Sequence, residues 1–375
     1  MKAKYFVSIL FCSMFLYLQL YSQNWDVLPT LVNGPPIPTM AAANGKIYIL
    51  SGSNAGTSLT HEYDPVTNQW TNKAAIPQSC VWATATEFNG KIYVIGGGQS
   101  NVKKPFNQIY DPLTDTWTNG ADLITPRMYQ SASVVNGMIY IIGGQNGDNT
   151  TEWQFDGYNP ATDKWKTFSK QPHNGAWYCA AAGVDKSFYR IAGGGWTIIQ
   201  ALDYFDSYNT ETDAWETLTA FPLKLHASSA VTLQGKIYLM GGITNQVSID
   251  SIYIYNPESG IWSLSLNKLP EPMVYHRTAV IGNYIYVYYQ SDVDNTGHFY
   301  RYKFGTTDVD ENLTNINLDL ELTPNPCING FNINYNGLLS KNINIKVFNI
   351  LGEEIYSNIE QIETITGLSM DEKRG

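Results

Sequence analysis

One short strand pattern occurs six times along this chain, at intervals of 45 to 49 residues. The first copy reads GKIYI at residues 45–49, and the fifth reads GKIYL at residues 235–239. A repeat of this length is typical of architectures in which each unit buries its apolar face only against its neighbours. The central tyrosines of the six copies are Tyr48, Tyr93, Tyr140, Tyr189, Tyr238 and Tyr286.

Each strand is followed by further repeated features. Several copies end in a glycine pair, such as Gly96-Gly97 or Gly193-Gly194, where glycine permits positive φ angles or a close backbone approach. A Tyr-Asp/Asn-Pro segment with turn-forming chemistry comes next and leads to a tryptophan. A tryptophan between neighbouring sheets buries about 150–250 Å², which contributes at most roughly 4–6 kcal/mol. These tryptophans are Trp70, Trp117, Trp165, Trp215 and Trp262.

The strand, the glycine pair, the Tyr-Asp-Pro turn and the tryptophan together resemble the kelch repeat. The resemblance covers about 280 residues and implies an all-β fold, a six-bladed β-propeller with four-stranded blades. An open solenoid is the competing arrangement, but it requires capping repeats, which the sequence does not contain.

The two ends of the repeat region complement each other. Trp25 lies in phase with Trp70 but lacks the three preceding strands of a repeat, whereas the sixth repeat has strands at Tyr286 and at 299–302 and no tryptophan. We therefore expect the N-terminal strand around Trp25 to supply the outermost strand of the last blade and close the ring. Ser51-Gly52 and Tyr289-Gln290 replace the glycine pair in the first and sixth repeats, which predicts a looser backbone approach there.

The N-terminus predicts export. Lys2 and Lys4 precede an apolar stretch at 6–21, about 16 residues long, which is shorter than the roughly 20 residues of a membrane span. We expect a cleaved signal peptide at residues 1–22. A membrane anchor and a lipoprotein modified at Cys12 are the alternatives, although Phe11 precedes that cysteine where a small residue is needed.

Charge and cysteine content exclude several functions. The net charge of −10 with no basic run disfavours nucleic acid and anionic lipid as partners. Removal of residues 1–22 leaves Cys80, Cys179 and Cys327, an odd number without a CxxC pair, which argues against a disulfide framework and structural zinc. We expect a monomer without metal or cofactor.

The sequence changes character after the propeller, which we place at residues 23–305. Residues 306–320 form a polar linker, and residues 321–375 contain a Pro-Asn-Pro start, alternating strands at 331–334 and 343–349 and a Leu-Gly-Glu-Glu turn. This tail resembles the small β-sandwich-like C-terminal sorting domain of the type IX secretion system of Bacteroidetes, which implies the secretion machinery as a partner. After Ser369 the sequence departs from that pattern, so we expect a truncated domain without its last strands. An ordinary small β-sandwich is the alternative.

The start of each innermost strand predicts the ligand site, because these positions meet at the mouth of the central channel. Four of the six residues in this column are large aromatics, which stack on apolar sugar faces while Arg and His donate hydrogen bonds. Packing of the inner strands is the alternative role. The column contains Ile37, Trp82, Tyr129, Tyr178, Ala227 and Tyr275, and Arg127 and Trp177 complete the expected ligand-binding set.

Two enzymatic interpretations remain open. Some kelch propellers are sialic-acid epimerase-like, and that resemblance would use His226, His276, Arg127 and Arg277 as acid, base and anion-binding groups. A copper radical oxidase needs two His and two Tyr ligands and additional domains, and only five histidines are present.

No recognised catalytic motif accompanies the repeats. We interpret the acids of the repeats as solvated turn residues rather than as an acid/base pair. We therefore predict a secreted or surface kelch propeller that binds a glycan or protein without catalysis, and a sugar epimerase or mutarotase (an isomerase) is the alternative. The acids in question are Asp111, Asp115, Asp206 and Asp213.

Overall fold

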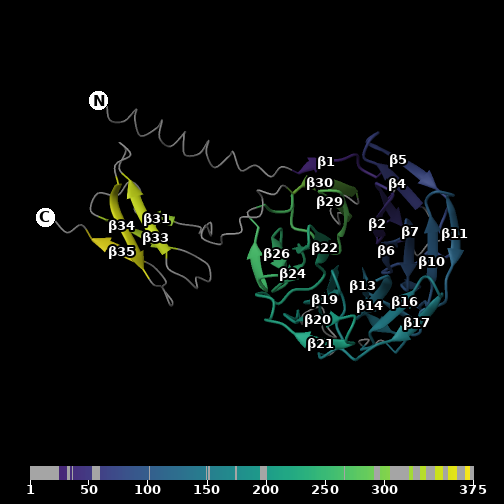
Figure 1. Cartoon of the computed structure of the whole chain (residues 1–375). Helices are drawn as coiled ribbons and strands as arrows, with labels where there is room; N and C mark the ends of the chain where they lie inside the picture. The colour runs from purple at the N-terminus through teal and green to yellow at the C-terminus, as the bar shows by residue number, and fades with distance from the viewer. Residues whose placement is uncertain are drawn as a thin grey trace. The chain divides into compact units, whose positions relative to one another are not determined.

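A computed structural model of the full chain shows a ring of β-sheets and a separate small β-unit (Figure 1). In the ring, the structure describes residues 25–31, 34–35, 37–52, 60–100, 102–148, 150, 153–173, 175–194, 201–265, 267–290 and 296–304, and in the tail it describes five strands. The predicted signal peptide and linker lie outside the described residues. The chain divides into two compact units, Met1–Asp308 and Val309–Gly375.

In the described part of the ring, six four-stranded antiparallel sheets form the blades, which confirms the predicted six-bladed propeller. Within each blade the strands follow one another from the channel outward. Blade 1 contains β2 (Thr39–Ala43), β3 (Lys46–Leu50), β4 (Thr60–Asp64) and β5 (Gln69–Lys73); blade 2 contains β6 (Thr84–Phe88), β7 (Lys91–Ile95), β10 (Asn107–Asp111) and β11 (Thr116–Asn119); blade 3 contains β13 (Ser131–Val135), β14 (Met138–Ile142), β16 (Asp156–Asn159) and β17 (Lys164–Thr167).

The second half of the ring repeats this plan. Its innermost strands neighbour those of the adjacent blades, and β28 lies against β2 of blade 1, so the circle is closed. Blade 4 contains β18 (Ala180–Val184), β19 (Ser187–Ile191), β20 (Phe205–Asn209) and β21 (Ala214–Thr217); blade 5 contains β22 (Ser229–Leu233), β23 (Lys236–Met240), β26 (Ile252–Asn256) and β27 (Ile261–Leu264); blade 6 contains β28 (Arg277–Ile281), β29 (Tyr284–Gln290), β30 (Gly297–Lys303) and β1.

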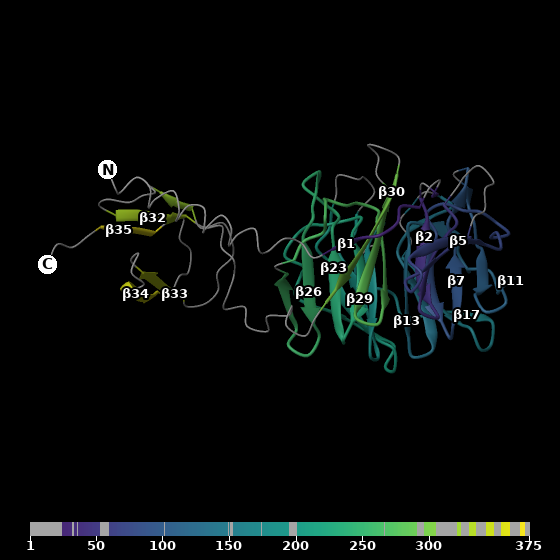
Figure 2. The ribbon, with the colours of Figure 1, turned by 90° about the horizontal axis from the view of Figure 1, so that it is seen from above.

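The outermost strand of blade 6 comes from the N-terminus, as predicted. Strand β1 (Asp26–Val27) pairs antiparallel with β30, and Figures 1 and 2 both show the purple strand beside the green one. The carboxylate of Asp26 also accepts a 2.7 Å bond from the guanidinium of Arg301, its partner in the register. The ring is therefore closed by chain segments from its two ends.

In blades 1 to 5, the second residue of the glycine-pair position donates a backbone hydrogen bond to the next blade near the channel mouth. Gly97 in blade 2 donates its backbone N–H to the carbonyl of Arg127 in blade 3, at 2.8 Å. In blade 1, Ser51 and Gly52 adopt φ angles of 59° and 103°, and Gly52 donates to the carbonyl of Cys80 at 2.9 Å. The expectation of a looser approach in the first repeat was therefore wrong, because Ser51 adopts the same left-handed backbone as glycine.

Two other repeats depart from the expected pair. In blade 4 the residues at these positions are Ala192 and Gly193, with φ angles of 54° and 114°, so the pair begins one residue before Gly193-Gly194. In blade 6, Tyr289 and Gln290 continue β29 and pair with β30.

The repeated tryptophans connect neighbouring blades from the outside. The indole Nε1 of Trp117 donates to the carbonyl of Ala74 in the preceding blade at 2.8 Å, and Trp70, Trp165 and Trp215 make equivalent bonds at 2.8–2.9 Å. Asp115 reinforces this contact, because its carboxylate accepts from the backbone N–H of Ala74 at 2.8 Å. The interpretation of Asp115 as merely a solvated turn acid was therefore wrong.

The tail forms two small sheets. The order of one sheet is β31-β32-β35, and the other pairs β33 with β34. The last of these strands forms at Leu368–Asp371 and spans the point after Ser369 where the sequence departs from the sorting-domain pattern, so the expected truncation stays a prediction. The bounds are β31 (Glu321–Thr323), β32 (Gly330–Asn334), β33 (Ile343–Phe348), β34 (Glu354–Glu360) and β35 (Leu368–Asp371).

Within the described residues, no helix is both long enough and apolar enough to cross a membrane.

Candidate functional site

The mouth column forms a physical circle at one end of the channel. Four of its six backbone N–H groups donate to the carbonyl of the column residue in the preceding blade: Tyr129 to Trp82 at 3.1 Å, Tyr178 to Tyr129 at 3.1 Å, Ala227 to Tyr178 at 3.1 Å and Tyr275 to Ala227 at 3.2 Å. The structure thus brings together, from four different blades, the aromatic residues that the sequence alignment grouped.

The side chains of this circle converge across the channel. We define the aromatic cluster as Trp82, Tyr129, Tyr178 and Tyr275. Ring centroids of Trp82, Tyr178 and Tyr275 form a closed triangle with separations of 5.5, 5.2 and 4.9 Å, and Tyr129 lies 4.6 Å from Tyr178. All four residues are half-buried, so part of each remains accessible.

The aromatic cluster has an unusual backbone. Its residues have φ angles between 50° and 66°, the left-handed region that bulky side chains rarely adopt. Such conformations cost on the order of 1–3 kcal/mol each, and they concentrate at functional sites. The circle of backbone hydrogen bonds holds these residues there, which directs their side chains over the channel axis.

An open cavity of about 140 Å³ is lined by the aromatic cluster and the first residues of the innermost strands. Its wall is made mostly of small Ala, Ser and Thr residues, with no Asp, Glu or Lys. The wall is therefore polar but carries a single permanent charge, that of Arg277.

Three backbone carbonyls fix the Arg277 guanidinium. Nε donates to Pro38 of blade 1 at 2.9 Å, and Nη1 donates to Tyr275 at 2.8 Å and to His276 at 3.2 Å. Burial lowers the pKa of Arg277 to about 10, and the neighbouring Tyr178 acts in the opposite direction. Arg277 remains a cation at neutral pH.

The two predicted catalytic histidines are both buried, with exposed fractions of 2%. His276 lines the cavity and has no hydrogen-bond partner at either ring nitrogen, whereas His226 does not line it and pairs through its backbone with Ile243. Burial, and secondarily the charge of Arg277, lowers the pKa of His276 to about 3, and burial also lowers the pKa of His226. Both are neutral at pH 7.

The two remaining predicted residues differ in placement. Trp177 stacks on Tyr129 at a centroid distance of 6.0 Å and extends the aromatic cluster outward. Arg127 is fully buried and does not line the cavity, because its guanidinium binds the carboxylate of Asp156 and the carbonyl of Gln154. Its placement therefore does not fit the ligand contact that we expected.

Sequence analysis missed the buried acids that pair with such arginines. Asp206, interpreted above as a solvated turn acid, is fully buried in β20, where it lies 3.7 Å from the guanidinium of Arg190 and 3.0 Å from the imidazole of His173. Its position two residues before the buried Tyr208 was the available signal, because alternate residues of a strand share a face.

No group of His, Cys, Asp and Glu side chains in the described part of the chain has an arrangement that could hold a metal ion.

The closed ring of six four-stranded blades defines this unit as a six-bladed β-propeller, and the aromatic cluster lies at its channel mouth. The family model described as the KLHDC2/KLHL20/DRC7 Kelch-repeats domain matches residues 82–289, more than half of the chain, and the chain belongs to the kelch-repeat family. A second model, the secretion system C-terminal sorting domain, matches residues 321–372. The tail is thus a sorting domain of the predicted type, which implies contact with the secretion machinery and secretion or anchoring at the cell surface.

Two individual proteins are similar to parts of this chain, one in sequence and one in structure. Human Kelch-like protein 33 is 41% identical over 59 residues, which are 16% of this chain and 11% of that protein. A solved structure of YjhT is 18% identical with a TM-score of 0.62, and the match covers 73% of this chain and 95% of that one. At this identity the second likeness supports the propeller fold alone.

Proposed function

We propose that this protein is an exported, non-catalytic binding module whose aromatic cluster recognises a glycan at the channel mouth. The observation that carries the proposal is the convergence of four half-buried aromatic residues, each with a left-handed backbone, on one mouth. Sugar rings have apolar faces that stack on Trp and Tyr rings. A packing role alone does not require bulky residues in this costly conformation.

The surroundings of the cluster favour a neutral or weakly anionic sugar. The single permanent charge of the cavity wall, Arg277, already uses Nε and Nη1 for backbone carbonyls. Tyrosine hydroxyls remain un-ionised at neutral pH, since burial raises the pKa of both Tyr129 and Tyr178. Recognition would therefore depend on stacking and hydroxyl hydrogen bonds.

The proposal also assigns roles to the segments on either side of the propeller. We propose that residues 1–22 are a cleaved signal peptide, that residues 23–305 act as a monomeric propeller, and that residues 306–320 link it to the sorting domain. A protein ligand at the same mouth is the alternative to a glycan, and a parallel glycoprotein screen would detect it.

A glycan array tests the binding site. The Trp82→Ala/Tyr129→Ala double variant should lose binding, because it removes two of the four stacking surfaces. Tyr284→Ala is the matched control, since Tyr284 begins β29 at the end of the blade away from the mouth and should not affect binding. Circular dichroism verifies that both variants fold. Full binding by a folded double variant would exclude the mouth.

A sugar epimerase or mutarotase is the second candidate, favoured by the buried His276 with two unpartnered ring nitrogens at the cavity wall. A neutral imidazole can accept a proton at pH 7. Incubation of candidate sugars with the protein in deuterated solvent separates the two functions. An epimerase that exchanges a carbon-bound proton incorporates deuterium and His276→Gln abolishes this, whereas a binding module incorporates none; for a mutarotase, the rate of anomer interconversion is the readout.

A further inference from the structure

The channel cavity is lined by a half-buried cation without a counter-ion. Arg277 lines the cavity, and its guanidinium donates its hydrogen bonds to the backbone carbonyls of Pro38, Tyr275 and His276. Among the described residues, no carboxylate lies within ion-pair distance of its guanidinium. A charge removed from bulk water is costly unless an opposite charge or a set of hydrogen bonds compensates it.

The other arginines of the described ring show how this protein usually compensates such a charge. Arg127 and Arg190 are fully buried beside Asp156 and Asp206, and Arg301 pairs with Asp26. Arg277 is the exception. Among the described arginines, the missing acid is therefore specific to the one that borders the channel cavity.

The cavity wall has the chemistry of an anion site. No acidic residue lines it. The Ser131 hydroxyl already donates to the carbonyl of Cys179, whereas Ser229 and Thr278 share one hydrogen bond, which leaves one of their two O–H groups free to donate. The buried Oγ of Ser228 has no hydrogen-bond partner, and neither have the ring nitrogens of His276, which is only 2% exposed. The free O–H of the Ser229–Thr278 pair, the Ser228 hydroxyl and the single N–H of the neutral His276 ring can donate hydrogen bonds to an anion that Arg277 attracts.

Size restricts the ligand class. The volume of about 140 Å³ is well above the roughly 10–15 Å³ that a single water needs, but below the approximately 300 Å³ at which pockets for drug-sized ligands begin. We propose that the channel of this propeller binds one small monovalent anion, a halide or a small carboxylate, beside Arg277 and beneath the aromatic cluster.

Anion binding would be coupled to ring closure. Nε of Arg277 in blade 6 donates to the carbonyl of Pro38 in blade 1, so this side chain connects the last blade to the first at the mouth. An anion that neutralises Arg277 lowers the cost of keeping this half-buried charge in position. A ligand that binds only the folded ring raises the melting temperature as its concentration increases.

Thermal unfolding of the full chain tests the site without reference to glycan binding. Chloride replaces gluconate, which is too large for the cavity, at constant ionic strength. The melting temperature should rise with the logarithm of the chloride concentration in the wild type and in Arg301→Gln, and stay constant in Arg277→Gln. A stronger rise with formate than with chloride assigns the site to a carboxylate, and the reverse assigns it to a halide.

A second variant keeps the test valid if Arg277→Gln does not fold. Ala132→Val fills part of the cavity without altering the guanidinium, and it should also remove the chloride dependence. Crystals soaked in bromide should show an anomalous peak beside Arg277. Identical melting temperatures of the wild type in chloride, formate and gluconate would overturn the proposal, and soaked crystals without that peak would exclude a halide as the ligand.

Discussion

The indole Nε1 of Trp25 donates a hydrogen bond to the backbone carbonyl of Lys268 at 2.6 Å, although 243 residues separate the two. The ring of Trp25 also packs on Tyr302, with centroids 5.3 Å apart. The first described residue of the propeller is thus attached to its fifth and sixth blades. Circular closure makes the stability of the whole ring depend on this contact.

Trp25→Ala tests the closure. Loss of a buried tryptophan costs about 3–5 kcal/mol, and the variant should lower the free energy of unfolding by about that amount in one cooperative transition. Urea denaturation measures it. Trp153→Ala is the control, because Trp153 is 39% exposed and lies outside the closing strand. Equal stability of the two variants would show that the N-terminal strand does not close the ring.

Close backbone contact at the glycine pair of blade 2 gives the second prediction. A Cβ at Gly97 would lie 2.8 Å from the carbonyl oxygen of Val81, whereas a Cβ at Gly137 would have no heavy atom within 4 Å. Both glycines have positive φ, 89° and 75°, so both alanine variants bear conformational strain. Gly97→Ala should therefore lower the melting temperature clearly more than Gly137→Ala. Similar decreases would mean that only φ matters at these positions.

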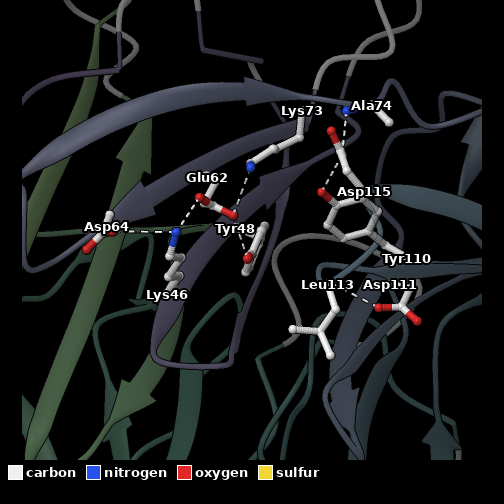
Figure 3. A network of polar contacts seen from close by, with 10 residues as sticks. All are labelled: Lys46, Tyr48, Glu62, Asp64, Lys73, Ala74, Tyr110, Asp111, Leu113 and Asp115. Atoms are coloured by element: carbon white, nitrogen blue, oxygen red, sulfur yellow. Dashed lines mark hydrogen bonds and ion pairs between the residues drawn. The ribbon is translucent and has the colours of Figure 1, made fainter.

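The polar network of blade 1 predicts a pH dependence (Figure 3). Glu62 accepts hydrogen bonds of 2.7 Å from Lys46 and from Tyr48, and Lys73 lies 3.5 Å away. Burial alone would raise the pKa of Glu62, but these bonds outweigh it and lower the pKa below its ordinary value of 4.5.

A carboxylate whose pKa is lowered by folding stabilises the protein above pH 4.5 and loses this contribution as the pH falls through the folded-state pKa. Glu62→Gln should therefore melt at a lower temperature than the wild type at pH 7, and the difference should shrink below pH 4.5. Melting curves across this range measure it, with the exposed Glu258→Gln as the control. A difference that stays constant with pH would contradict the role of the carboxylate.

Arg127 yields a stability prediction in place of the binding role that sequence analysis assigned. Both Arg127 and Asp156 are fully buried and paired. Removing one partner leaves an uncompensated charge at a cost of about 3–5 kcal/mol, whereas an apolar pair of similar volume is often tolerated. Asp156→Leu should be strongly destabilised in chemical denaturation, and Arg127→Met/Asp156→Leu should regain much of the loss. No recovery in the double variant would contradict the pairing.

How much the sequence predicts depends on whether a feature is repeated. The six tyrosine strands, the tryptophans and the missing partner of Trp25 recur at a constant interval, and they determine the blade number and the closure in advance. The mouth column was predictable for the same reason. Arg127 and Asp206 were misplaced because their environment depends on which way one side chain points, and a single residue carries no periodic signal for that.

The contact of Trp82 with Tyr178 could not be predicted either. The two ring centroids are 5.5 Å apart, although the residues belong to different blades. The left-handed backbone at both positions directs the two side chains toward each other across the channel. Positive φ at a bulky residue has no reliable signature in the sequence. The sequence therefore predicted a circle of aromatics but not that their rings meet.

Hydroxyl-radical footprinting with a glycan identified on the array tests most directly whether the mouth is the ligand site. Oxidation of Trp82, Tyr129, Tyr178 and Tyr275 is compared with and without the sugar, and the exposed Trp153 serves as an internal reference. Protection confined to the four mouth residues is the predicted result. Protection of Trp153 or of another surface, with unchanged oxidation at the mouth, would contradict the account.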